Sequence, residues 1–253
     1  MRQILFYILK NGLRDRLYLG LFIVLTISLA ISVFLGSTMM VESNISSIIF
    51  GLAISRTVVS LGMILFVCIN ISRAFDNKEI EFILSKSISR EQFVIGYLGG
   101  FFVASILIIS PLTLLIAVIY KINYLGLFYW FISTLLENLI VICFAVLSSL
   151  ILKNSFSAIL ASLGFYAISR LMGMFVMTID FTDEVSKANH GDLGMALKIL
   201  SIIFPRLDLY SQSSWPVYGD WNDSILLIIL FQSLIYLPLL IFMSFHDFKK
   251  KQF

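Results

Sequence analysis

The chain has 253 residues, of which 59% are hydrophobic and only 13% carry a charge. With a mean hydropathy of +0.98, it is too apolar for a soluble globular protein of this length. Its net charge of +3 gives no reason to expect a nucleic-acid partner. We therefore predict an all-α membrane protein in which residues 1–253 form a single transmembrane domain.

The first sixteen residues form an element of their own. Leu5, Leu9 and Leu13 recur every four residues, while most polar residues fall elsewhere on the helical wheel. An amphipathic helix of this kind lies flat at a membrane interface. We predict an interfacial elbow helix over residues 1–16, with a plain extension of the first spanning helix as the alternative.

Six apolar runs are long enough to cross a hydrocarbon core of about 30 Å, which takes about 20 helical residues. They lie at about 17–36, 48–72, 95–120, 127–152, 156–179 and 224–245. Lys and Arg gather in the segments that share a side with both termini. The positive-inside rule therefore predicts that both termini lie in the cytoplasm.

A charged amphipathic segment, residues 73–92, separates the second and third runs. Within it, Ile80 and Ile83 fall on one face of a helix. Ser89 is followed three residues later by Gln92, which is the pattern of a capping box, so a new helix is expected to begin there. We interpret the segment as a cytoplasmic docking loop.

Residues 180–223 form the one substantial loop on the other side. They contain an apolar stretch that ends at Pro205 and is too short to cross a bilayer. We predict a short outer helix before the last span, lying on the surface or re-entering the membrane. Trp215, Tyr218 and Trp221 are typical of interfacial anchors. The carboxylates are scattered along the loop, so no metal site is predicted.

Arg56, Glu137 and Arg170 are the ionisable residues well inside the runs. The helical rise places all three roughly 12 to 15 Å below the outer surface. A charge at that depth costs at least about 2.5 kcal/mol, so such groups usually find partners. We predict a Glu137–Arg170 pair, with Arg56 either joining it or extending outward. The pair either fixes helix packing or forms an outer gate or a site for an anionic headgroup.

Small residues form a stripe on the fifth run. Ser157, Ala161 and Gly164 share this stripe, and small side chains let helices approach closely in a membrane. We predict a helix interface here. The interface lies either between two copies of the protein or within one copy.

Several chemical motifs are absent. The sequence has neither GxxxxGK[ST] nor GxGxxG for binding a nucleotide, and no HExxH for zinc. We therefore do not expect this chain to be an enzyme by itself.

Taken together, the elbow helix, six spans, charged loop and outer helix resemble the permease subunit of type-2 ATP-binding-cassette exporters. The resemblance covers the whole chain, and its most specific part is the charged loop. There the family pattern of an acidic helix, a Leu-Ser turn, an apolar-Ser-Arg triplet and a glycine corresponds to Glu79, Glu81, Leu84, Ser85, Ile88, Ser89, Arg90 and Gly96. Ser87 departs from the pattern, because proline is frequent at that position.

The resemblance implies that separate ATPase subunits, which bind ATP and Mg, dock on residues 73–92. Glu79, Glu81 and Arg90 would form charge pairs with them, and Phe82 or Ile83 would supply an apolar anchor. It also implies a second or related permease as partner, in a homo- or heterodimer surrounded by lipid in a bacterial cytoplasmic membrane.

Two other classes of function remain open. One is an accessory or assembly subunit that does not transport. The other is an embedded enzyme, which would need a convergent set of polar residues. The sequence does not specify a substrate.

Overall fold

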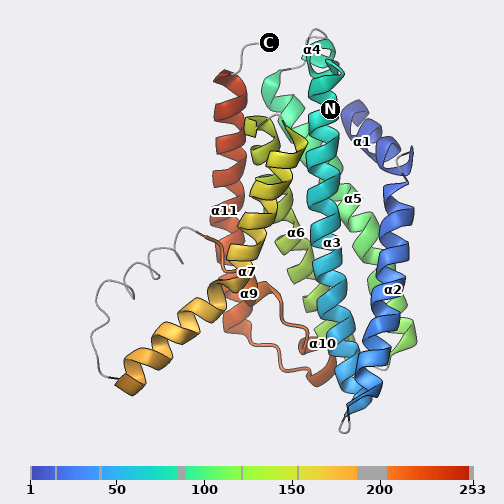
Figure 1. Ribbon diagram of the computed structural model, residues 1–253, viewed down its shortest axis with the longest axis vertical. Coiled ribbons are helices and arrows are strands. Elements are labelled where there is room, and N and C mark those ends of the chain that lie inside the picture. The colour runs from blue at the N-terminus through green and yellow to red at the C-terminus, as the bar shows by residue number, and fades with distance from the viewer. Residues whose placement is uncertain are drawn as a thin grey trace.

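The computed structural model describes residues 2–14, 16–39, 42–84, 89–120, 122–152, 154–186 and 204–250. In these ranges all regular elements are helices (Figure 1): α1 (Arg2–Arg14), α2 (Leu17–Ser37), α3 (Ser43–Asp76), α4 (Glu79–Leu84), α5 (Arg90–Ile119), α6 (Tyr124–Leu152), α7 (Ser155–Ser186), α9 (Leu207–Tyr210), α10 (Trp215–Tyr218) and α11 (Asp223–Lys250). Six of the described helices, α2, α3, α5, α6, α7 and α11, are long and apolar enough to cross a membrane. The predicted fold class is confirmed.

The centre of the bundle is formed by α3 and α6. In the most apolar stretch of α6, 67% of the residues are buried, against 17% in α11. The helix α6 contacts α3, α5, α7 and α11, and α2 packs along α3. The polar side chains of α6, among them Ser133, Glu137 and Asn138, are buried and therefore face other helices.

The helix α1 is separate from α2, because Arg16 between them has a left-handed backbone with a φ of 54°. This break favours an elbow helix over an extension of the first span. The helix packs on α5, where a Cβ at Gly100 would lie 2.6 Å from Ile8 Cδ1. Leu13 does not belong to this contact and is 69% exposed, because the packed face runs through Ile8 and Gly12.

The turn between α3 and α5 contains α4. It lies at the same end of the bundle as both chain termini (Figure 1). The predicted capping box is present, because Gln92 N donates to Ser89 Oγ at 3.2 Å and Ser89 N donates to Gln92 Oε1 at 3.3 Å. The predicted start of α5 is therefore confirmed.

The opposite end of the bundle differs from the prediction in two respects. First, α7 continues to Ser186, beyond the expected end of the span near residue 179. Second, Trp215 is a core residue and not an interfacial anchor, because it is only 2% exposed. Its backbone carbonyl packs so closely on Gly126 that a Cβ on that glycine would collide with it. Tyr218 stays 55% exposed. Most of the predicted outer helix lies in residues 187–203, outside the described part.

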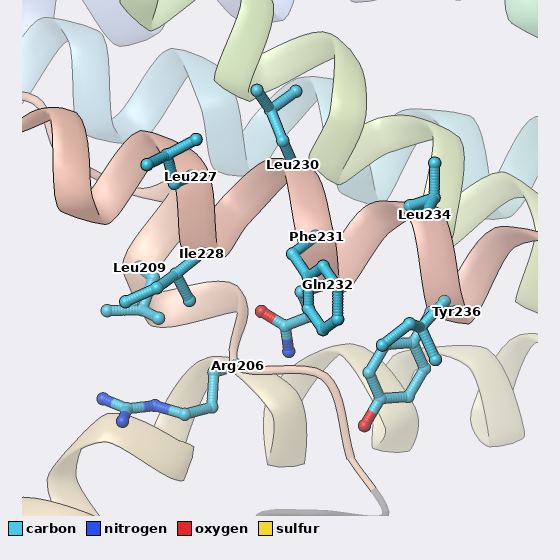
Figure 2. A pocket seen from close by; sticks show the side chains of 10 residues that line it. Arg206, Leu209, Leu227, Ile228, Leu230, Phe231, Gln232, Leu234 and Tyr236 are labelled. Carbon is cyan, nitrogen blue, oxygen red and sulfur yellow. The ribbon is translucent and has the colours of Figure 1, made fainter.

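An apolar groove, which we call the α11 groove, runs along the half of α11 nearest α9 (Figure 2). Its volume is about 780 Å³. The lining residues are Arg206, Leu209, Leu227, Ile228, Leu230, Phe231, Gln232, Leu234, Ile235 and Tyr236.

Candidate functional site

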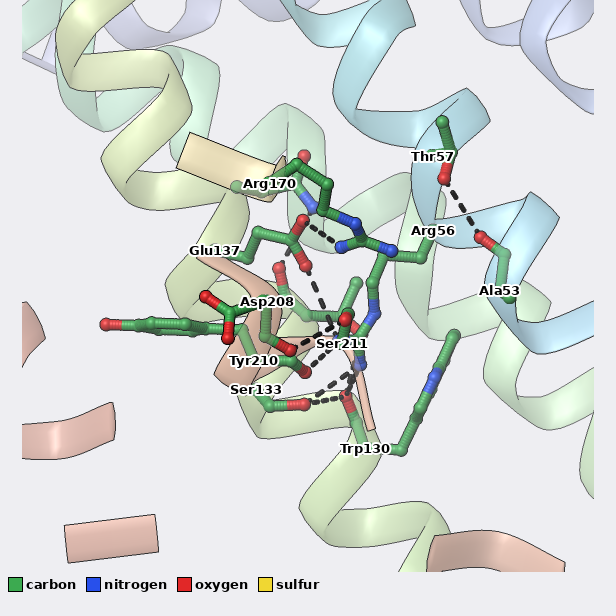
Figure 3. Close-up of polar contacts among 12 residues, drawn as sticks. Ala53, Arg56, Thr57, Trp130, Ser133, Glu137, Arg170, Asp208, Tyr210 and Ser211 are labelled. Atoms are coloured by element: carbon green, nitrogen blue, oxygen red, sulfur yellow. Dashed lines mark hydrogen bonds and ion pairs between the residues drawn. The ribbon is translucent and has the colours of Figure 1, made fainter. Parts of the chain in front are cut away.

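Three ionisable side chains from three spanning helices meet inside the bundle (Figure 3). Arg56 comes from α3, Glu137 from α6 and Arg170 from α7. The side chains of Arg56 and Glu137 are 0% exposed, and that of Arg170 is 24% exposed. We call these three residues the buried charge cluster.

Glu137 is the shared partner in the cluster. Its Oε1 lies 2.9 Å from Arg170 Nη1, and its Oε2 lies 3.5 Å from Arg56 Nη1. The structure thus contains the predicted Glu137–Arg170 pair and resolves the position of Arg56, which joins the pair. Charges buried from water need this kind of pairing, because removing one partner leaves the other charge uncompensated.

Further contacts hold Arg56 in place. Its Nη2 donates to Ser133 Oγ at 2.9 Å and to the Trp130 carbonyl at 3.2 Å, and its Nη1 donates to the Tyr210 carbonyl. The guanidinium carbon also lies 5.2 Å from the centre of the Trp130 ring, a cation–π distance. Tyr210 belongs to α9 and donates its hydroxyl to the Ile229 carbonyl of α11 at 3.0 Å. Arg56 therefore links α3 and α6 to α9.

Charge in this part of the protein is unbalanced. Two guanidinium groups share the Glu137 carboxylate, while the neighbouring Arg206 pairs with Asp208 at 3.0 Å. Among the side chains that the structure describes here, three arginines thus face two carboxylates, which favours an anion nearby. Among the described residues, no group of three His, Cys, Asp or Glu side chains is placed to bind a metal.

Trp130 and Tyr210 were not identified from the sequence as partners of the cluster. Trp130 had a detectable signal, since it lies seven residues before Glu137 and so shares its face of α6. Tyr210 acts through its carbonyl, 154 positions away from Arg56. Every residue has a backbone carbonyl, so the sequence does not show which carbonyl accepts a hydrogen bond from a distant side chain.

The second candidate region is residues 73–92, the coupling segment. Its Glu79 Oε2 accepts a hydrogen bond of 2.6 Å from the Tyr7 hydroxyl of α1. Burial and the hydrogen bond to Glu79 raise the pKa of the Tyr7 phenol above its ordinary value. The elbow helix is thus bonded directly to α4.

The other end of the coupling segment is bonded to α11. Arg90 Nη1 donates to the carbonyls of Phe248 and Lys249 at 3.0 and 2.7 Å. A cation at the C-terminus of a helix satisfies unpaired carbonyls and complements the helix dipole. Glu91 adds an exposed ion pair with Lys249 at 2.5 Å.

These contacts refine the predicted docking residues. Glu79 and Arg90 bond within the chain and are only half-buried, whereas Glu81 is exposed. The side chains of Phe82 and Ile83 lie outside the described part. Contact of any of them with an ATPase stays a prediction.

The predicted small-residue stripe on α7 is only half-buried within the chain. A Cβ on Gly164 would meet nothing within 4 Å. Ala158 and Ser162, beside the stripe, are buried instead, and Ser162 hydrogen-bonds Ser148 of α6 at 2.8 Å. An interface of the stripe with a second copy stays a prediction.

The fold defines the class of the molecule: an integral membrane protein whose described residues are all-helical and include six apolar helices able to span the bilayer. No family model matches the chain, and no curated protein matches its sequence. Its function must therefore be argued from the two regions described above.

Proposed function

We propose that this chain is the permease subunit of an ATP-driven exporter of the type-2 ATP-binding-cassette class. The observation that carries the proposal is the bonded coupling segment. It presents a short amphipathic helix, α4, at the end of the bundle where both termini lie, and it is attached to α1 through Tyr7 and to α11 through Arg90. A movement of the coupling segment would therefore reach α1 and α11 at once.

The helix α3 supplies a mechanical link between the two candidate regions. It runs without interruption from Ser43 to Asp76 and adjoins α4 directly. Arg56 lies twenty residues before Asp76, so the distance along the helix is about 30 Å. Coupling over such a distance needs a packed element that both ends can bias. We assign this role to α3. In this proposal the buried charge cluster changes its arrangement when α3 moves, and so transmits the movement to the outer side.

In this function, ATP and Mg are bound by separate ATPase subunits that dock on the coupling segment from the cytoplasm. The site on this chain needs no cofactor of its own. A second copy or a related permease completes the transporter in a bacterial cytoplasmic membrane. The exported substrate is not assigned.

The function is tested by purifying the chain with its co-isolating ATPase and measuring ATP turnover with and without the permease. Glu81→Lys reverses the exposed charge of α4 and is expected to weaken ATPase association while leaving membrane insertion unchanged. Asp220→Lys is the matched control, because Asp220 is also exposed and lies at the opposite end of the bundle. A stable complex without any ATPase would instead favour an accessory subunit.

The orientation has a separate test. Cys68 and Cys143 are both buried and unpaired, so they are first replaced by alanine. Single cysteines are then introduced at Asp220 and Glu81, which are both exposed. An impermeant thiol reagent applied to intact cells should label the first only. Labelling of Glu81→Cys would reverse the orientation and exclude docking of a cytoplasmic ATPase on α4.

A further inference from the structure

The α11 groove has the dimensions of a lipid tail in one leaflet. Its lining on α11 runs from Leu227 to Tyr236, a length of about 14 Å at the helical rise. Half of a hydrocarbon core of about 30 Å is about 15 Å. The volume of about 780 Å³ falls within the range of about 300 to 1,000 Å³ for ligand sites.

A hydrocarbon chain alone would leave two polar atoms of the groove without hydrogen-bond partners. Arg206 Nε and Gln232 Oε1 are buried and have no hydrogen-bond partner among the described residues. An unpartnered polar atom is costly in a membrane, where no water replaces the missing bond. Arg206 needs an acceptor and Gln232 needs a donor.

The placement of these groups sets the direction of a ligand. In Figure 2 the Arg206 guanidinium extends toward the end of the groove at Leu209 and Ile228, and Tyr236 lies at the other end. The Ile228 end is nearer the start of α11 at Asp223, and hence nearer the membrane surface. The charged end of a bound amphiphile would therefore face the surface and its tail the bilayer midplane.

Charge favours an anionic ligand. Arg206 is paired with Asp208, but the adjoining buried charge cluster has two arginines for one carboxylate. The cluster and the groove are contiguous, because Tyr210 accepts a hydrogen bond from Arg56 and lies one residue after Leu209 of the groove. An anion near Arg206 would offset the excess positive charge.

We propose that the α11 groove binds one anionic phospholipid of the leaflet on the α9 side of the membrane. The phosphate accepts from Arg206, and one acyl chain lies along α11 past Gln232 toward Tyr236. Phosphatidylglycerol is an anionic phospholipid of this kind. This inference does not depend on the proposed transport function.

The test uses the full chain in nanodiscs with equal amounts of phosphatidylglycerol and phosphatidylcholine that carry identical acyl chains. The lipids retained after transfer to detergent are counted by native mass spectrometry. We expect preferential retention of phosphatidylglycerol. Arg206→Gln should lower that preference about fivefold, since one cation contributes roughly that factor to binding an anionic lipid. Equal retention of the two lipids would overturn the proposal.

A matched pair of variants locates the site without touching the charged residues. Ile235 lines the groove and Leu239, one turn further along α11, does not, although both are 48% exposed. Ile235→Trp should fill the groove and abolish retention of phosphatidylglycerol, whereas Leu239→Trp should leave it unchanged. Equal effects of the two variants would place the lipid elsewhere. Absence of retained lipid in a dimeric wild type would assign the groove to a second copy.

Discussion

The buried charge cluster and the coupling segment both join distant helices through polar side chains, but they do so in different surroundings. In the cluster, Arg56 and Glu137 are fully buried and each makes more than one contact. In the coupling segment, Glu91 and Lys249 form an ion pair while remaining more than half exposed. Water therefore competes with the second set of contacts and not with the first.

The comparison separates two tasks that an ion pair can perform. A buried pair adds little stability relative to apolar residues but becomes very costly to break. An exposed pair adds little stability when it forms and costs little when it breaks, so it can form and dissociate easily. A region that must move against a partner is better built from the second kind. Glu137→Gln and Glu91→Gln test this contrast directly, with the largest and the smallest expected effects. Between them, Gly100→Leu and Tyr7→Phe test how α1 is held beside the coupling segment.

Glu137→Gln should have the largest effect, because it leaves two arginines without their carboxylate. We expect the free energy of unfolding to fall by about 3 to 5 kcal/mol, measured by denaturation in detergent micelles. Arg170→Gln should cost less, since the Arg170 side chain is 24% exposed whereas Glu137 is fully buried. Equal stability of Glu137→Gln and wild type would show that the pairing is not energetically important.

Gly100→Leu tests the packing of the elbow helix α1 against α5. The new side chain would collide with Ile8 of α1, because even a Cβ lies 2.6 Å from Ile8 Cδ1. Overpacking of this kind typically costs about 1 to 3 kcal/mol. Gly99→Leu is the neighbouring control, since a Cβ there meets nothing within 4 Å. Protease cleavage within α1 should increase in the first variant only, and equal cleavage of both would contradict the packing of α1 on α5.

Tyr7→Phe removes the hydroxyl that bonds α1 to α4 and that also interacts with Asn11 of α1. The expected loss is about 0.5 to 1.5 kcal/mol, detectable as faster hydrogen exchange in α4. The raised pKa of Tyr7 sets the pH dependence. The stability from this bond is present below about pH 10 and is lost as the pH rises through the raised pKa. Tyr7→Phe should lack that alkaline transition, and its persistence in the variant would assign the transition to another group.

Glu91→Gln should have the smallest effect, about 0 to 1 kcal/mol, because its partner Lys249 is also exposed. The variant is a direct counterpart of Glu137→Gln: the same chemical change is made in an ion pair on the surface. The measurement is the same denaturation experiment at low and high salt. A loss as large as that of Glu137→Gln would remove the distinction between the two regions.

Much of this arrangement was predictable because its signals are local. Span length and hydropathy located the six helices, and the Ser89–Gln92 spacing fixed the start of α5. The Glu137–Arg170 pair followed from depth and the cost of a buried charge. Trp215 was misinterpreted because an aromatic side chain suits both a membrane interface and a core. The Tyr7–Glu79 bond joins residues 72 positions apart, and no sequence pattern links them.

The bonds of the coupling segment also set an order of assembly during synthesis. The acceptors of Arg90 in α11 follow it by 158 and 159 positions. At about 5 to 20 residues per second, they emerge from the ribosome roughly 8 to 30 seconds after Arg90. Until then the coupling segment has its attachment to α1 through Glu79 but not its attachment to α11 through Arg90. A chain interrupted before α11 would therefore present an incompletely anchored coupling segment, which would distinguish unfinished chains from finished ones.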